Sequence, residues 1–238
     1  MSKGQQFEIP PKSNEPRNIE AVLEKGEIKS VKELEGYGDM QLVGIQGGGD
    51  ALFRPNQETA SVFENTGKEA MASELEEMAF KVDEALGFGL VPPVAARTVN
   101  GVEGYLQQFI NDSQVAGLLE WRVIVKPEEL AKAAVFDYLL DVRDRRGDSF
   151  LINPKIGKIW LTGHDYWMFW NENARSDILR EAQVRGLNCL TPETRSALER
   201  FLPCIDSLTV EAKKEVATIL KKAQERAQLI LSEGQIPA

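Results

Sequence analysis

Apolar and polar residues alternate in the first third of the chain, which is typical of half-buried β-strands. Residues 27–34 follow this pattern, and residues 40–45 and 51–54 predict two further strands, with glycine-rich turns between the three. Residues 94–99 and 102–110 predict two more strands, joined at Asn100-Gly101. The pattern therefore predicts a small antiparallel sheet.

Two segments of the chain instead carry apolar residues at helical spacing. Residues 68–86 carry one apolar stripe at helical spacing, and Gly87 and Gly89 end it. The stripe consists of Met71, Leu75, Met78, Val82 and Leu86. Pro127 opens a second helix, whose apolar stripe ends where the charged segment from Asp141 begins. Both stripes indicate helices that face a core.

Two short apolar runs come next, and then the chain returns to helical spacing. Residues 150–152 and 158–161 predict a β-hairpin. After residue 170 the apolar spacing is helical nearly to the end, and Pro192 and Pro203 are expected to separate the helices. The whole pattern predicts an α+β fold, with a sheet first and helices later.

Composition narrows the possible functions. With 42% hydrophobic and 27% charged residues, the chain is typical of a globular protein. A net charge of -9 argues against nucleic acid as a partner, because that binding depends on clustered Lys and Arg. Residues 1–19 are polar and predict a flexible extension with no signal peptide, and no integral membrane segment is expected. Two isolated cysteines favour a reducing, cytoplasmic location.

Two acidic turns stand at the same end of the predicted hairpin. The first is Asp144-Arg145-Arg146-Gly147-Asp148-Ser149, and the second is Gly163-His164-Asp165. Phosphoryl transfer needs one carboxylate to orient the attacking hydroxyl and another to hold a metal. Taken alone, however, the first turn is more typical of a solvated, charged corner.

Two upstream features also have alternative interpretations. Gly47, Gly48 and Gly49 could cover a phosphate with their backbone amides, or could form a plain hairpin turn. Arg54 ends the third predicted strand, where it could contact a nucleotide or lie on the surface.

The segment MAFKVDEALGFGLVPPVAAR, residues 78–97, resembles a signature of the secretory-pathway casein kinases and of bacterial lipid-kinase-like proteins. Phe53-Arg54-Pro55 is similar to the Phe-Lys-Pro of these families, and the Asp144 turn resembles their catalytic loop and that of the phosphatidylinositol 3- and 4-kinases. The chain departs from the pattern at Arg54, where the families have lysine, at Ser149, where they have asparagine, and at Gly163, where they have a metal-binding aspartate.

The resemblance implies one bilobal, protein-kinase-like fold that binds ATP and Mg²⁺ between an N-lobe, residues 20–111, and a mostly helical C-lobe, residues 112–238. It assigns Asp144 as the catalytic carboxylate and Glu76 as the partner of Arg54, although Glu74 could compete for that partner. Adenine would bind near Gln107, Gln108 and Phe109, and the metal ligands would be Asp165 with Asp148 or Ser149.

The function implied is phosphotransfer to a protein or lipid hydroxyl. The alternative is a pseudokinase that keeps the fold and serves as a binding or scaffold module. The departures at Arg54, Ser149 and Gly163 favour the pseudokinase, whereas Asp144, Glu76 and Asp165 favour the enzyme.

Overall fold

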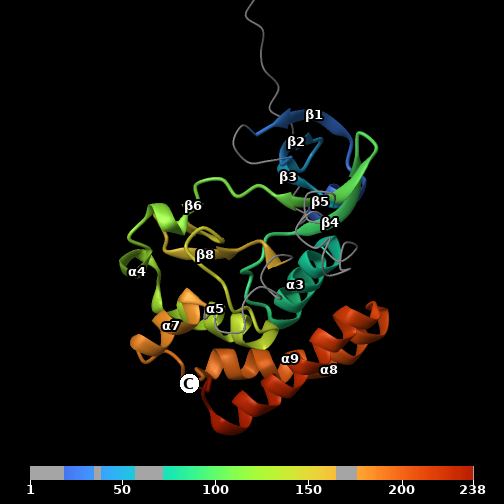
Figure 1. Ribbon diagram of the computed structural model, residues 1–238. Helices are drawn as coiled ribbons and strands as arrows, with labels where there is room; N and C mark the ends of the chain where they lie inside the picture. Colours follow the sequence, from blue (N-terminus) through green and yellow to red (C-terminus); the bar gives the residue numbers. More distant parts are fainter. Residues whose placement is uncertain (1–18, 35–38, 57–71, 165–175, 238) are drawn as a thin grey trace, which may run out of the picture.

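The computed structural model describes residues 19–34, 39–56, 72–164 and 176–237. Five strands form an antiparallel sheet at one end of the molecule (Figure 1). The strands are β1 (Ile28–Glu33), β2 (Gln41–Ile45), β3 (Gly49–Pro55), β4 (Val94–Val99) and β5 (Val102–Gln108), in the order β1-β2-β3-β5-β4. All five were predicted from the sequence.

One face of this sheet has its own small core. On β3 the buried side chains alternate with partly exposed ones, and Phe53 is almost fully buried. Helix α1 (Ile19–Lys25), which the sequence pattern did not predict, contributes the buried Leu23 to the same cluster. Arg97 fixes this helix to β4, because its guanidinium donates to the carbonyl oxygens of Leu23 and Gly26, both at 2.6 Å.

Helix α3 (Ala72–Leu86) confirms the first predicted helix over its described part. The stripe from Leu75 to Leu86 is buried, while Met71 lies outside the described residues. Gly87 ends the helix with φ of 70°, a conformation that favours glycine. Asp83 is also buried, and one of its carboxylate oxygens accepts hydrogen bonds from the N–H groups of Leu90 and Val91, at 2.7 and 2.9 Å.

Asp83 makes the stability of this turn depend on pH. Burial raises the pKa of Asp83 to about 6, although the Val91 and Leu90 N–H groups and the charge of Lys158 act in the opposite direction. A carboxyl group that binds its proton more tightly in the folded state stabilises the fold most at low pH. This contribution, of about 3 kcal/mol, is therefore present below pH 4 and is lost as the pH rises through 6.

We expect Asp83→Asn to remove this dependence, because a neutral amide oxygen still accepts the two backbone hydrogen bonds. Urea unfolding of both proteins between pH 4 and 7.5 measures the effect. The variant should gain stability relative to wild type as the pH rises, and the difference between the two curves should change most between pH 4 and pH 6, the interval between the unfolded and folded pKa values of Asp83. Curves that stay parallel over this range would show that Asp83 does not titrate there.

A second sheet follows the crossover from the first. It has three strands, β6 (Gln114–Val115), β7 (Phe150–Asn153) and β8 (Lys158–Leu161), in that order. The predicted hairpin is confirmed, with Phe150 opposite Leu161. Between β6 and the next long helix, the chain forms the short helices η2 (Ala116–Leu118) and α4 (Trp121–Ile124).

Four longer helices complete the described fold: α5 (Pro127–Leu140), α7 (Asp177–Val184), α8 (Pro192–Glu211) and α9 (Lys214–Glu233). Pro127 opens α5, as predicted, and Pro192 separates α7 from α8, also as predicted, because it is the first residue of α8. The prediction that Pro203 separates two helices was wrong, since α8 continues through it. Phe201 and Ile205, on either side of Pro203, are buried in the core, and this packing outweighs the backbone hydrogen bond that proline cannot make.

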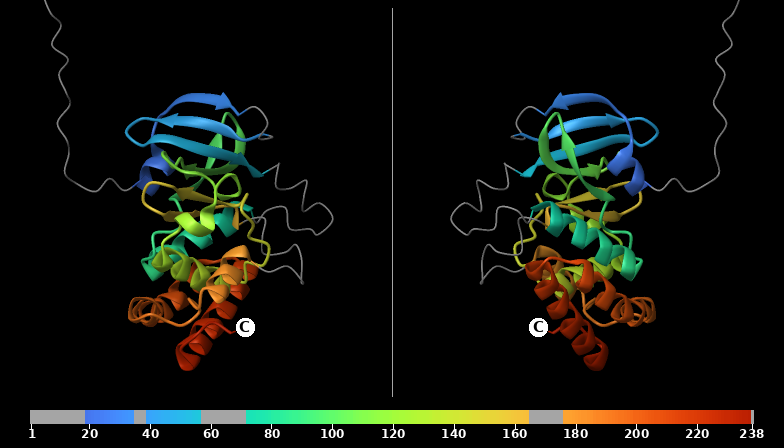
Figure 2. Two further views of the ribbon diagram at one scale, coloured as in Figure 1. Left: turned by 90° about the vertical axis from the view of Figure 1, so that its left-hand side faces the viewer. Right: turned by 90° about the vertical axis from the view of Figure 1, so that its right-hand side faces the viewer.

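The larger hydrophobic core joins parts of the chain on both sides of residue 111. It includes α3 residues such as Leu75 and Val82, together with buried residues of α5, α8 and α9. In both views of Figure 2, α8 and α9 lie at the end of the molecule opposite the five-stranded sheet. The fold is therefore a mixed α/β arrangement in which α3 packs against the C-terminal helices. The division at residue 111 stays a prediction.

Candidate functional site

Glu76 lies fully buried on α3 and connects three parts of the chain. Its Oε1 accepts hydrogen bonds from Gln107 Nε2 on β5, at 3.0 Å, and from the N–H of Gly163, at 3.1 Å. Its Oε2 accepts from the N–H of His164, at 2.5 Å. One carboxylate thus links the helix, the first sheet and the segment after β8.

The carboxylate of Glu76 is held in its charged form. Burial by itself would raise its pKa, but the charge of His164, the hydrogen bond from the His164 backbone N–H and the charge of Arg54 lower the pKa well below the ordinary value. His164 Nδ1 lies 3.3 Å from Glu76 Oε2, which is close enough for an ion pair when the imidazole is protonated, although the ring N–H is not aligned for a hydrogen bond. The site therefore contains a buried negative charge.

Arg54 lies on β3, next to the strand that carries Gln107. It pairs with Tyr105 in the register of β3 and β5, and its Nη1 donates to the Tyr105 hydroxyl at 3.3 Å. Its charge is close enough to lower the pKa of Glu76. The structure thus brings the two residues into the same region, while their direct pairing stays a prediction.

Asp144 stands in the loop that follows α5. The helix ends at Asp141, whose left-handed conformation (φ 56°, ψ 40°) turns the chain. The Asp144 side chain is 10% exposed, and its Oδ1 accepts a hydrogen bond from Arg146 Nε at 2.7 Å. The predicted catalytic carboxylate is thus largely buried and paired with an exposed arginine side chain.

The next residue, Arg145, points the opposite way, into the core. Its Nε lies 2.8 and 3.0 Å from the two carboxylate oxygens of Asp137, and neither side chain is exposed. Nη1 donates to the carbonyl oxygens of Ser149 and Thr162, both at 3.2 Å. The interpretation of this turn as a solvated corner is therefore wrong for Arg145, which anchors the loop to α5 and to the end of β8.

The Asp137 carboxylate is shared with the start of α7. Ser176 Oγ donates to Asp137 Oδ2 at 2.7 Å and also accepts from the N–H groups of Ile178 and Leu179 as the helix cap. Burial raises the pKa of Asp137, and Arg145 and Ser176 counteract this rise. Sequence reasoning did not identify this network, because Asp137 stands within an otherwise apolar helical stripe.

The two candidate metal ligands of this loop differ in their surroundings. The Ser149 hydroxyl accepts from the Arg146 N–H at 3.0 Å and donates to the Arg146 carbonyl oxygen at 2.7 Å, so it closes the turn. Asp148 is exposed. Gly147 allows the turn to pack against Gly117, because an added Cβ would lie 2.9 Å from Gly117 Cα.

The second acidic turn is described only in part. Gly163 has φ of 70°, and the fully buried His164 lies edge-on to Phe136, with 5.6 Å between ring centroids. Asp165, the predicted main metal ligand, lies outside the described residues. Within the described part of the chain, no three acidic, histidine or cysteine side chains converge on a metal position.

Two backbone N–H groups at the predicted adenine-binding strand already form hydrogen bonds within the protein. The N–H of Gln108 donates to the Pro93 carbonyl oxygen at 2.9 Å, and the N–H of Phe109 donates to that of Asp50 at 3.0 Å. These two amides are therefore not available to adenine in this conformation. Gln107 contributes its side chain to Glu76, a role that sequence reasoning did not assign.

The glycine run forms the hairpin between β2 and β3. Gly47 and Gly49 both have φ of 79°, so they adopt the left-handed conformation that tight turns require. An added Cβ at Gly48 would lie 2.6 Å from a methyl group of Val22. The turn interpretation thus accounts for all three glycines, and phosphate binding by this hairpin stays a prediction.

Comparison with known proteins adds a structural likeness and no sequence match. No protein-family model matches the chain, and no curated protein matches it. Among the described helices, none is long and apolar enough to span a membrane. The structure is similar to the crystal structure of the Golgi casein kinase, with a TM-score of 0.57 and 16% identity over 90% of this chain and 75% of that one. The fold of this chain is therefore kinase-like.

Proposed function

We propose that this protein is an ATP-dependent phosphotransferase of the atypical kinase class, which acts on a protein or lipid hydroxyl. In this proposal, residues 20–111 form the N-lobe and residues 112–238 form the C-lobe of one kinase-like domain. The observation that carries it is the buried Glu76, whose carboxylate accepts hydrogen bonds from Gln107 on β5 and from the Gly163–His164 backbone immediately before Asp165. A kinase-like fold supports it.

Asp144 would act as the base or the orienting group for the acceptor hydroxyl. A carboxylate in this role must lie within hydrogen-bonding reach of the hydroxyl and remain ionised near neutral pH. The Asp144 side chain keeps a small exposed fraction, 10%, and the Arg145–Asp137 pair fixes the backbone on one side of it. Arg146, which now binds Asp144, would have to share or release that carboxylate when the substrate binds.

The cofactors proposed are ATP and Mg²⁺. Magnesium prefers hard oxygen ligands, and Asp165, Asp148 and Ser149 would supply them on this chain. Bound magnesium would neutralise phosphate charge during transfer. Arg54 would contact phosphate and Gly47–Gly49 would cover it, while adenine would lie against Gln107 to Phe109. The cytoplasmic location expected from the sequence also stays a prediction.

A second candidate function is a pseudokinase that binds partners without transferring phosphate. It is favoured by the local engagement of two catalytic candidates, since the Ser149 hydroxyl closes its own turn and the Glu76 oxygens are bound by Gln107, Gly163 and His164. These contacts hold the fold together whether or not nucleotide binds. A measurement of ATP turnover, and not of ATP binding, therefore distinguishes the phosphotransferase from the pseudokinase.

Thermal unfolding with ATP tests whether the chain binds nucleotide. At about 100 times Kd, a ligand that binds only the folded state adds about 2.7 kcal/mol, or about 5–10 °C in Tm for a chain of this size. We expect a shift of this order at millimolar ATP with Mg²⁺ and a smaller one without it. No shift in either condition would contradict nucleotide binding.

Two matched variants locate the site. Arg54→Met removes a partly buried cation beside the candidate site, and we expect it to reduce the ATP-dependent shift by more than half. Lys32→Met makes the same kind of change at an exposed position on β1, two strands away from β3, and should leave the shift unchanged. If wild type shows the shift but releases no ADP from Mg-ATP, the pseudokinase is the better description.

A further inference from the structure

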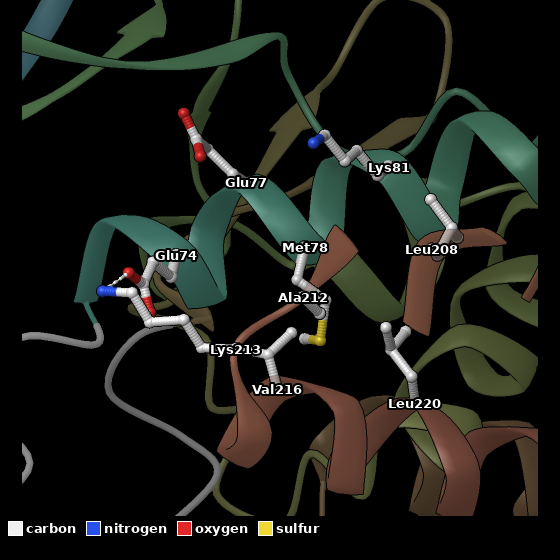
Figure 3. A pocket seen from close by; sticks show the side chains of 9 residues that line it. All are labelled: Glu74, Glu77, Met78, Lys81, Leu208, Ala212, Lys213, Val216 and Leu220. Carbon is white, nitrogen blue, oxygen red and sulfur yellow. Dashed lines mark ion pairs between the residues drawn. The ribbon is translucent and has the colours of Figure 1, made fainter. Parts of the chain in front are cut away.

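A pocket of about 200 Å³ lies between α3 and the elbow that joins α8 to α9 (Figure 3). Its apolar floor consists of Met78, Val216 and Leu220, which are at most 5% exposed. Leu208 and Ala212 continue this floor from the α8 side. In Figure 3 the Met78 side chain points from α3 toward α9. The pocket is separate from the candidate site, because Glu76 bonds to β5 and to the 163–164 segment.

Charged side chains form the edge of this pocket. Glu74 and Lys213 form an ion pair across one side of it, and Glu77 and Lys81 line the α3 side. Glu77 is engaged, because its Oε1 accepts the N–H of Ala96 at 2.5 Å. Glu74 binds Lys213 through Oε1, while its Oε2 is inaccessible to solvent and has no hydrogen-bond partner among the described residues.

A buried carboxylate oxygen without a hydrogen-bond donor is unfavourable. A ligand that supplies a donor there would gain binding free energy. A donor that entered this pocket would satisfy Glu74 Oε2 and would bury its remaining surface against Met78, Val216 and Leu220. The pocket therefore combines one acceptor with an apolar floor, as ligand sites commonly do.

We propose that this pocket binds a small aromatic molecule that carries one N–H donor, of the size of indole. An apolar cavity of about 150 Å³ accommodates benzene. About 200 Å³ is therefore enough for a fused two-ring molecule, but it is below the range of about 300 Å³ and above that is typical of larger ligands. Indole places an N–H at the edge of an apolar ring, which matches one acceptor beside an apolar floor.

A free small molecule fits this pocket better than an anchor from another protein. Stable protein contacts cover about 800 Å² on each partner and have a dehydrated, mainly apolar centre. Here the apolar floor is small, and charged groups surround it: Glu74, Lys213 and Lys81. Desolvating these charges over a large contact would oppose docking, whereas a molecule of one or two rings would contact Glu74 and leave Lys213 and Lys81 in water.

Titration of the full chain with indole, followed through ¹³C-methyl methionine signals, tests the proposal directly. The chain has five methionines, and Met78→Leu assigns the signal of interest. We expect a saturable ring-current shift of the Met78 methyl group. The matched probe 1-methylindole keeps the rings and lacks the N–H, so it should bind about tenfold more weakly.

Ala212→Phe should fill the pocket and abolish the Met78 shift, since Ala212 has an extended backbone (φ -87°, ψ 150°) that accepts any side chain. Glu74→Leu should make the affinities for indole and 1-methylindole equal. The proposal is overturned if indole up to its solubility limit causes no saturable shift, or if both probes bind wild type equally well. The comparison of probes on wild type decides this even if Ala212→Phe does not fold.

Discussion

Replacing Arg145 with methionine should lower the free energy of unfolding by about 3–5 kcal/mol, which is the cost of leaving one partner of a buried ion pair unpaired. Methionine keeps much of the apolar volume but leaves the Asp137 carboxylate with Ser176 as its remaining side-chain partner. It also removes the donor shared by the carbonyl oxygens of Ser149 and Thr162. Urea unfolding measures the loss, which should also lower Tm by about 10 °C.

Arg143→Met provides the matched control. Arg143 is two residues away in the same loop and pairs with Asp141, but both side chains are about two-fifths exposed, at 44% and 39%. Exposed ion pairs contribute about 0–1 kcal/mol, so this variant should unfold close to wild type. The double variant Arg145→Met with Asp137→Leu should recover much of the lost stability, because no buried charge remains unpaired. A loss below about 1 kcal/mol for Arg145→Met would show that the pair is not the anchor of the loop.

The Arg145 result also shows why sequence reasoning located this loop but did not describe it. Local spacing predicted the end of α5 and the hairpin of β7 and β8, since both depend on neighbours within a few residues. Whether Arg145 or Arg146 is buried depends on Asp137 and on the Thr162 carbonyl oxygen, which lies 17 residues further along the chain. Two adjacent arginines have no local feature that separates them.

In the candidate site, too, the features that depend on nearby residues were predicted and those that depend on distant residues were not. The helical stripe predicted α3, and the resemblance to kinases assigned Glu76 to the site. The partners of Glu76, however, are 31 to 88 residues away. Two of them are backbone N–H groups, which every residue except proline has, so the sequence does not identify them. The burial of His164 was missed because it follows a glycine in a polar turn, where exposure is the ordinary expectation.

Long-range packing also explains the wrong prediction at Pro203. Proline in a helix interior costs about 3 kcal/mol, which makes it a reasonable place to expect a break. Helix α8 continues because its buried residues, including Leu198, Phe201 and Ile205, form one surface against the core. A tertiary surface of this kind can be recognised only when its partners on α3 and α9 are known.

If the chain transfers phosphate, Asp144→Asn should reduce ATP turnover by about 10²–10⁴, the usual contribution of a positioned acid or base. The amide keeps the size of the side chain and an oxygen for Arg146 Nε, but it cannot accept a proton from the acceptor hydroxyl. Release of ADP from Mg-ATP measures the rate. The ATP-dependent rise in Tm should persist, because Asp144 is assigned to the hydroxyl and not to the nucleotide.

Asp141→Asn makes the same chemical change three residues earlier and controls for effects on the loop. Asn tolerates the left-handed conformation of this position, and Asp141 forms exposed or partly exposed pairs with Arg143 and Arg226. Its turnover should equal that of wild type. Equal rates for wild type and Asp144→Asn, with wild-type turnover well above background, would remove Asp144 from the proposed role. Because the Arg145 anchor is intact in both variants, a loss specific to Asp144→Asn would report on the carboxylate and not on the position of the loop.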